Sequence, residues 1–102
     1  SLCLVAGMKF CSERKPGLYR RVGIACGLDV ICGSDKEADE RTISFVATFL
    51  TNLGLGSKLS EQGVKREHIE SLSAQAVDDP CHRTNAVPVT LEDFQRLYTA
   101  LV

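Results

Sequence analysis

The sequence predicts an all-α protein with about five helices. Apolar residues recur at spacings of three and four, capping signals precede two of the apolar runs, and no strand-like alternation lasts more than a few residues. At 102 residues the chain is long enough to bury a small core, and it predicts one helical domain over residues 1–102.

The first two helices are predicted near the N-terminal end. The chain begins without an initiator methionine and enters an apolar run from Leu2 to Phe10 almost at once, so it is typical of a helix whose beginning is missing. A second helix is predicted over 16–27, because proline suits a first turn and glycine suits a helix end. Its expected buried stripe is Leu18, Val22 and Ala25.

A long third helix is predicted from Ser34 to Leu53. Ser34 and Glu37 have the spacing of a capping box, and Asp35 adds negative charge where the helix dipole favours it. The acidic run over 34–40 lacks the spacing and the glycine of an EF-hand, so it reads as a solvated helix start. The expected inner face is Ile43, Val46, Ala47, Leu50 and Leu53, widened by Phe45 and Phe49.

Two more helices are predicted in the remaining sequence. Residues 54–64 predict a loop with one helical turn at 57–62, and a fourth helix follows over 66–77. Pro80 closes that helix. The last helix runs from Thr90 to Leu101, because Thr90 is a favoured N-cap and Asp93 approximates a capping box. Its apolar stripe is Leu91, Phe94, Leu97, Tyr98 and Leu101.

Charge and hydropathy exclude several classes of partner. The net charge is −1 and the twelve basic residues are scattered, which predicts neither a nucleic-acid partner nor a membrane-surface partner. No apolar run approaches the roughly 20 residues that a bilayer span needs, and no signal-peptide order is present. We therefore expect a cytoplasmic location.

The five cysteines predict neither a zinc ribbon nor a disulfide framework. Their number is odd and no C-x-x-C pair occurs. Reduced thiols used as small core residues are the expectation for the first four, with Cys26 on a helical face as an example.

No residue of this chain is predicted to be catalytic, metal-binding or cofactor-binding. The two histidines, His68 and His82, lie in different elements and cannot form an i, i+4 pair, and His68 is expected on the surface. Cys81 and His82 are adjacent in sequence, so their side chains are expected to diverge rather than form a nucleophile–base pair. The loop around them reads either as a stiff connector or as part of a site.

Five segments then follow one another in a fixed order: Leu4–Phe10, Tyr19–Asp29, Leu53–Val64, Asp79–Asn85 and Val89–Tyr98. Together they resemble the C-terminal part of the iron-dependent (group III) alcohol dehydrogenase family. The first is similar to the helix end that follows the family's last metal-binding histidine. The third has the family's leucine-glycine, leucine-serine-glutamate and glycine-valine connector, and the last two match its closing loop and final helix.

The resemblance implies a parent enzyme with a dinucleotide-binding α/β domain and an all-helical metal domain. In such enzymes one aspartate and three histidines hold Fe²⁺ (or Zn²⁺), which polarises the substrate oxygen while NAD or NADP exchanges hydride. None of those ligands can be placed in residues 1–102. The chain is therefore expected to be a bundle-like part of a larger dehydrogenase helical domain. The implied partners are the remainder of the dehydrogenase chain, a small alcohol or aldehyde, and further copies in a homo-oligomer.

The resemblance also implies a place for the loop at 79–85. In the family this loop approaches the substrate cleft, so Cys81 is expected to line that pocket, with His82, Thr84 and Asn85 beside it. After Asn85 the sequence departs from the family pattern, because Ala86-Val87 replaces a proline-led turn. A cysteine at position 81 favours the general alcohol or aldehyde branch over the branch that reduces maleylacetate.

Two alternatives remain open at this point. One is a stand-alone helical interaction module without catalytic activity, and the other is a small independent metal or thiol enzyme. If the chain is a fragment, we expect exposed apolar faces along residues 2–10 and part of 43–53, which self-association or crystal neighbours would bury.

Overall fold

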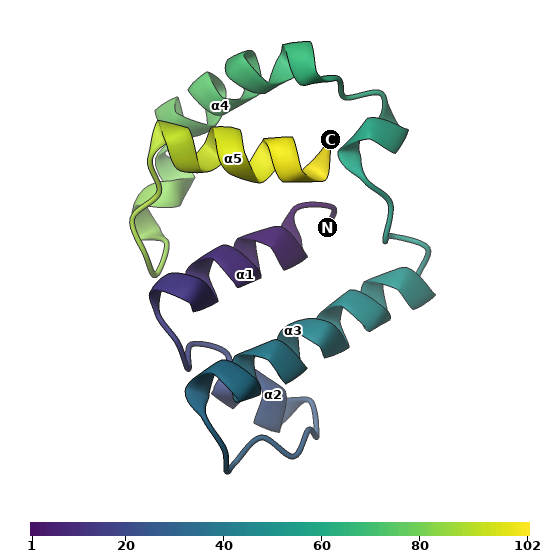
Figure 1. Cartoon of the computed structure of the whole chain (residues 1–102), viewed down its shortest axis with the longest axis vertical. Helices are drawn as coiled ribbons and strands as arrows, with labels where there is room; N and C mark the ends of the chain where they lie inside the picture. Colours follow the sequence, from purple (N-terminus) through teal and green to yellow (C-terminus); the bar gives the residue numbers. More distant parts are fainter. The chain divides into compact units, whose positions relative to one another are not determined.

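The structure, a computed structural model, describes all residues from 1 to 102 and contains five α-helices, three short 3₁₀ turns and no strand (Figure 1). This confirms the predicted all-α class. The chain divides into two compact units, residues 1–56 and 57–102, which are described separately. A single domain over 1–102 stays a prediction. None of the helices combines the length and apolar character that crossing a membrane requires.

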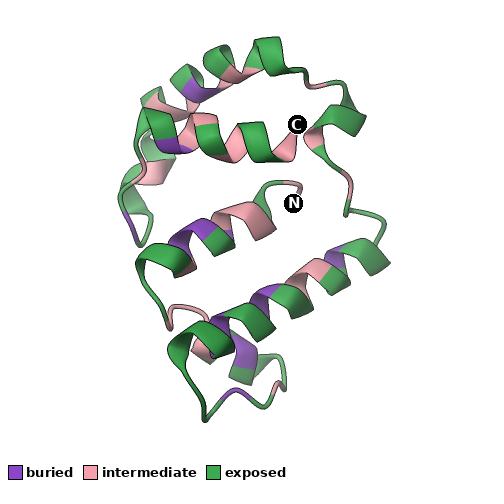
Figure 2. Cartoon of the chain, viewed as in Figure 1, coloured by how far each residue is buried: buried purple, intermediate pink, exposed green.

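The first unit is built on its longest helix. Helices α1 (Leu4–Arg14) and α2 (Arg20–Ala25) both pack on α3 (Asp35–Asn52). The Ser34 hydroxyl accepts a hydrogen bond from the Glu37 backbone N–H at 3.1 Å, which confirms the predicted start of α3. The buried apolar residues of this unit are Met8, Phe10, Cys11, Val30, Ala38, Ile43 and Leu50. Figure 2 colours the buried residues of the chain purple.

The predicted register of α2 was wrong. The helix begins at Arg20, and Val22 and Ala25 are exposed. Gly17 has φ +89°, a left-handed conformation that prevents a helix from continuing through it. The face toward α3 runs through Gly23, where an added Cβ would lie 2.3 Å from Thr42 Oγ1. A glycine at this position lets the two helix backbones approach closely.

A buried carboxylate ties the three helices together. Asp39 has no exposed area, and it accepts hydrogen bonds from the Ser12 hydroxyl at 2.7 Å and from the Gly17 and Tyr19 backbone N–H groups at 2.8 and 2.9 Å. The solvated helix start predicted for 34–40 is therefore wrong at this residue. Burial, and next the Cys11 thiol, raise the pKa of the adjacent Tyr19 phenol to about 12.

The prediction that the first four cysteines are small core residues is wrong for three of them. Cys11 is buried, but Cys3, Cys26 and Cys32 are exposed. Cys26 is the residue that follows the last turn of α2. Cys32 lies in the loop between α2 and α3, and the buried residue of this loop is Val30.

The inner face of α3 is narrower than predicted. Ile43 and Leu50 are buried and Val46 and Ala47 are half-buried, but the side chains of Phe45, Phe49 and Leu53 are exposed. At four-residue spacing these three residues lie on another side of the helix, which neither α1 nor α2 covers. In α1 the expectation of an exposed face holds for Leu4, whereas Met8 and Phe10 are buried.

The second unit is a helical hairpin with a structured connection. Two 3₁₀ turns, η1 (Leu59–Gln62) and η2 (Arg66–His68), lead into α4 (Ile69–Asp78), which packs against α5 (Leu91–Leu101). The turn predicted within 57–62 is confirmed as η1. The capping box that starts α5 is also confirmed: the Asp93 N–H donates to Thr90 Oγ1 at 3.3 Å, and the Thr90 N–H donates to the Asp93 carboxylate at 3.0 Å.

Candidate functional site

A hollow of about 360 Å³ lies in the second unit, where the loop after α4 meets α5. This loop forms a 3₁₀ turn, η3 (Pro80–Thr84). The hollow has mainly apolar walls and a few polar groups, the usual composition of small-molecule sites. Its lining residues are Leu72, Gln75, Ala76, Asp79, Cys81, His82, Phe94 and Tyr98.

The loop is held in place by its own polar groups. Asp79 precedes η3 and its carboxylate accepts a hydrogen bond from the Cys81 N–H at 2.8 Å, while Pro80 occupies the first position of the turn. The His82 ring donates through Nε2 to the Val77 carbonyl at 2.8 Å. Its ring also meets the Phe94 ring edge-on, with centroids 5.6 Å apart. His82 is thus fixed against both helices of the hairpin.

The aromatic wall continues along α5. The rings of Phe94 and Tyr98 stack with centroids 6.3 Å apart and an interplanar angle of 21°. The sequence placed both residues in an apolar stripe and gave them no part in a site. An aromatic pair one turn apart, following a Pro-Cys-His loop, is the signal that could have indicated this wall.

The contacts of the loop favour the protonated form of the Cys81 thiol. The Asp79 carboxylate accepts a hydrogen bond from the thiol, which raises the pKa of Cys81, and the carboxylate's negative charge raises it further. The same hydrogen bond, with the one from the backbone, lowers the pKa of Asp79. Since a thiolate is the nucleophilic form of cysteine, this arrangement suits a pocket wall better than a nucleophile.

The four predicted pocket residues divide into two pairs. Cys81 and His82 line the hollow together. Thr84 and Asn85 serve the loop itself: the Thr84 hydroxyl donates to the Cys81 carbonyl at 3.1 Å, and the Asn85 amide donates to the Val87 carbonyl at 2.9 Å. A role for these four residues at a substrate cleft stays a prediction.

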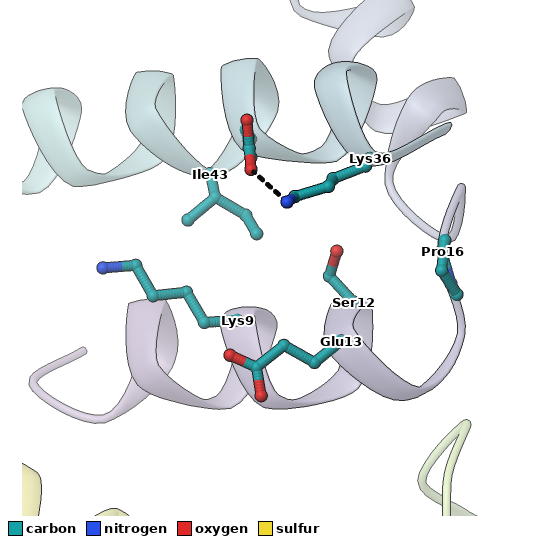
Figure 3. A pocket seen from close by; sticks show the side chains of 7 residues that line it. Lys9, Ser12, Glu13, Pro16, Lys36 and Ile43 are labelled. Atoms are coloured by element: carbon teal, nitrogen blue, oxygen red, sulfur yellow. Dashed lines mark ion pairs between the residues drawn. The ribbon is translucent and has the colours of Figure 1, made fainter. Parts of the chain in front are cut away.

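A second hollow of about 570 Å³ lies in the first unit, between α1 and α3 (Figure 3). Two lysines and two glutamates give its lining no net charge, and Lys36 pairs with Glu40 at 3.9 Å. The Ser12 hydroxyl is engaged with Asp39. This hollow therefore favours neither anions nor cations. Its lining residues are Lys9, Ser12, Glu13, Pro16, Lys36, Glu40 and Ile43.

The residues of this chain do not fit the metal or the dinucleotide that the resemblance implies. No group of three or more His, Cys, Asp or Glu side chains lies close enough to hold a metal ion. His68 is exposed, as predicted, and its Nδ1 accepts a hydrogen bond from the Lys65 N–H at 3.0 Å. No strand leads into a glycine-rich turn of the kind that binds a pyrophosphate.

Comparison with known proteins gives relatives of one chemical kind. The chain is 32% identical over 80 residues to lactaldehyde reductase of Escherichia coli (strain K12), which covers 78% of this chain and 21% of that protein. It is 34% identical over 64 residues to NAD-dependent methanol dehydrogenase of Bacillus methanolicus, covering 63% and 17% of the two chains. It is 37% identical over 60 residues to alcohol dehydrogenase 4 of Saccharomyces cerevisiae (strain YJM789), covering 59% and 16%.

The chain spans about a fifth of the length of the first of these relatives. No solved structure gives a significant match. A family match described as Fe-containing alcohol dehydrogenase family, C-terminal, extends over residues 1–102. The chain therefore belongs to the Fe-containing alcohol dehydrogenase family and corresponds to its C-terminal region.

Proposed function

We propose that this chain is the C-terminal helical portion of an NAD(P)-dependent, metal-dependent alcohol dehydrogenase. The parent enzyme interconverts alcohols and aldehydes or ketones by hydride transfer. The observation that carries this proposal is the family match over all 102 residues. The names of the relatives, a lactaldehyde reductase, a methanol dehydrogenase and an alcohol dehydrogenase, agree with this reaction class.

The cofactors of the parent are NAD or NADP and Fe²⁺ (or Zn²⁺), held by residues outside this chain. The metal supplies Lewis-acid polarisation of the substrate oxygen when it is bound. Because residues 1–102 contain no cluster able to hold a metal, the chain by itself has no dehydrogenase activity in this proposal. A homo-oligomeric parent and a cytoplasmic location remain predictions.

Within the parent, the hollow beside Cys81 forms one wall of the substrate cleft. Its support is local: Asp79 and Pro80 fix the turn, His82 is anchored to α4 and α5, and the remaining walls are apolar. Small alcohols and aldehydes suit such a wall, since their alkyl part needs apolar contact and their oxygen needs the metal.

Enlarging the side chain at position 81 tests this role in the full-length parent. We expect Cys81→Phe to lower kcat/KM for a longer alcohol, relative to a short one, by about tenfold or more, because a filled pocket rejects extra methylenes. Cys32→Phe is the matched control, since Cys32 is also an exposed thiol but lies in the first unit. If both variants keep the parental ratio, Cys81 does not line the cleft.

The alternative is a stand-alone helical interaction module. Exposed apolar side chains on α3 are the observation that favours it. It predicts that the natural polypeptide carrying these residues lacks an upstream Asp-x-x-x-His pair, two further histidines and a glycine-rich nucleotide loop. Determining the upstream coding sequence decides between the two proposals.

A further inference from the structure

The imidazole of His82 is held in one tautomer. Val77 lies in the last turn of α4, and its carbonyl lacks the usual helical partner because the Cys81 N–H is bonded to Asp79 instead. The Nε2 atom of His82 lies 2.8 Å from this carbonyl oxygen. Because a carbonyl oxygen accepts and does not donate, Nε2 carries the proton of the neutral ring, and Nδ1 carries a lone pair.

The Nδ1 atom of His82 has no hydrogen-bond partner within the chain. The other contact of the ring is its edge-on packing against Phe94. The Asp79 carboxylate, a second polar group of the same hollow, is already engaged by the backbone and the thiol of Cys81. His82 therefore brings an unused hydrogen-bond acceptor to a hollow whose walls are mainly apolar.

An unused acceptor in an apolar hollow selects ligands that carry a hydrogen-bond donor. A ligand without a donor would displace water from Nδ1 and leave that atom unpaired, which costs binding free energy. Burial of a charged donor such as an ammonium group among apolar side chains costs more than burial of a hydroxyl. The hollow of about 360 Å³ thus favours a small, neutral molecule with a hydroxyl group.

We propose that His82 is a specificity-determining residue of the parent enzyme, and that its Nδ1 accepts a hydrogen bond from a second hydroxyl group of the substrate. The reacting oxygen is not this donor, because the metal that polarises it is held by residues outside this chain. The proposal assigns the parent to alcohols and aldehydes with a hydroxyl beyond the reacting carbon. It rests on the proposed function, since it requires the hollow to form part of the substrate cleft.

A comparison of two alcohols of equal size tests the proposal in the full-length parent. Propane-1,3-diol and butan-1-ol differ only in a terminal hydroxyl that replaces a methyl group. We expect the parent to prefer the diol, measured as the ratio of the two kcat/KM values at about pH 8, where imidazole is mostly neutral. His82→Phe should lower this ratio about fivefold or more, because the new ring still packs on Phe94 but offers no acceptor.

Two matched variants separate the acceptor from the anchor to Val77. In His82→Asn the amide oxygen takes the place of Nδ1, but the side chain is too short to reach the Val77 carbonyl, so the ratio should persist. In His82→Gln the amide N–H replaces Nε2 and no acceptor replaces Nδ1, so the ratio should fall even if His82→Phe does not fold. His68→Phe is the control, because His68 is exposed and does not line the hollow.

The outcomes distinguish this proposal from the proposed function. A ratio that falls in His82→Phe and His82→Gln, and persists in His82→Asn and His68→Phe, supports it. Equal losses in His82→Phe and His82→Asn show that His82 only anchors the loop and overturn it. A parent that oxidises both alcohols without preferring the diol, or an unchanged ratio in every variant, overturns this proposal alone. A parent that oxidises no alcohol overturns the proposed function as well.

Discussion

Replacing Gly23 with alanine tests how α2 packs on α3. The added Cβ would lie 2.3 Å from Thr42 Oγ1 and 2.8 Å from Val30 Cγ2, although real contacts of this kind essentially never fall below 3.0 Å. Neither neighbour has room to move: Val30 is 1% exposed, and Thr42 is fully buried with its hydroxyl donating to the Ala38 carbonyl at 2.8 Å. The substitution must therefore push the two helices apart.

We expect Gly23→Ala to lower the free energy of unfolding by about 1–3 kcal/mol, the usual cost of an extra methyl group in a filled core. For a chain of this size each kcal/mol corresponds to about 4–8 °C in the thermal midpoint. Chemical denaturation followed by circular dichroism measures the change directly.

Gly7→Ala is the matched control. Gly7 lies inside α1, and a Cβ placed there would have no heavy atom within 4 Å. The same substitution should therefore stabilise the chain by up to about 1 kcal/mol through helix propensity alone. Removing the closest neighbour with Thr42→Ala should also reduce the cost of Gly23→Ala in a double-mutant cycle. If Gly23→Ala stabilises as Gly7→Ala does, the assigned packing face of α2 is incorrect.

Three further predictions concern single side chains. The Ser73 hydroxyl is fully buried without a hydrogen-bond partner, so Ser73→Ala should raise the free energy of unfolding by about 1 kcal/mol. If denaturant titrations show instead that Ser73→Ala lowers the free energy of unfolding, the hydroxyl has a hydrogen-bond partner. Folding raises the pKa of Tyr19 from 10.0 to about 12, so the unfolded chain loses the phenol proton at a lower pH than the folded chain. The free energy of unfolding should therefore fall as pH rises between those values. Tyr19→Phe should remove this part of the pH dependence. Asp79→Asn removes the carboxylate whose hydrogen bond from the thiol, and then whose charge, raises the pKa of Cys81. Alkylation of Cys81 at mildly alkaline pH should therefore become faster, while Cys32 keeps its rate. An unchanged Cys81 rate would contradict the assigned contact.

The elements that the sequence predicted best are those fixed by local chemistry. Helices α3 and α5 start at the predicted capping residues, Ser34 and Thr90, because a cap and its partner lie only three residues apart. The turn after Asp79 likewise follows from its own aspartate and proline, so the position of Cys81 and His82 in a fixed loop could be predicted from the sequence.

What the sequence could not predict depends on distant partners. The buried state of Asp39 requires Ser12, Gly17 and Tyr19, which lie 27, 22 and 20 residues away. The register of α2 depends on the approach of Gly23 to Thr42, and apolar periodicity carries no information about such an approach. The aromatic wall of the hollow also forms only when α5 packs on α4, and the four-residue spacing of Phe94 and Tyr98 is its one local signal in the sequence.

In the proposed function, these helices are the C-terminal portion of a metal-dependent alcohol dehydrogenase and have no dehydrogenase activity on their own. Alcohol-dependent reduction of NAD⁺ or NADP⁺ by the full-length parent, measured beside the 102-residue chain with Fe²⁺ or Zn²⁺ supplied to both, tests it most directly. We predict turnover by the parent that a chelator abolishes, and none by the isolated chain. A parent without such turnover, or turnover by the isolated chain, would contradict the claim.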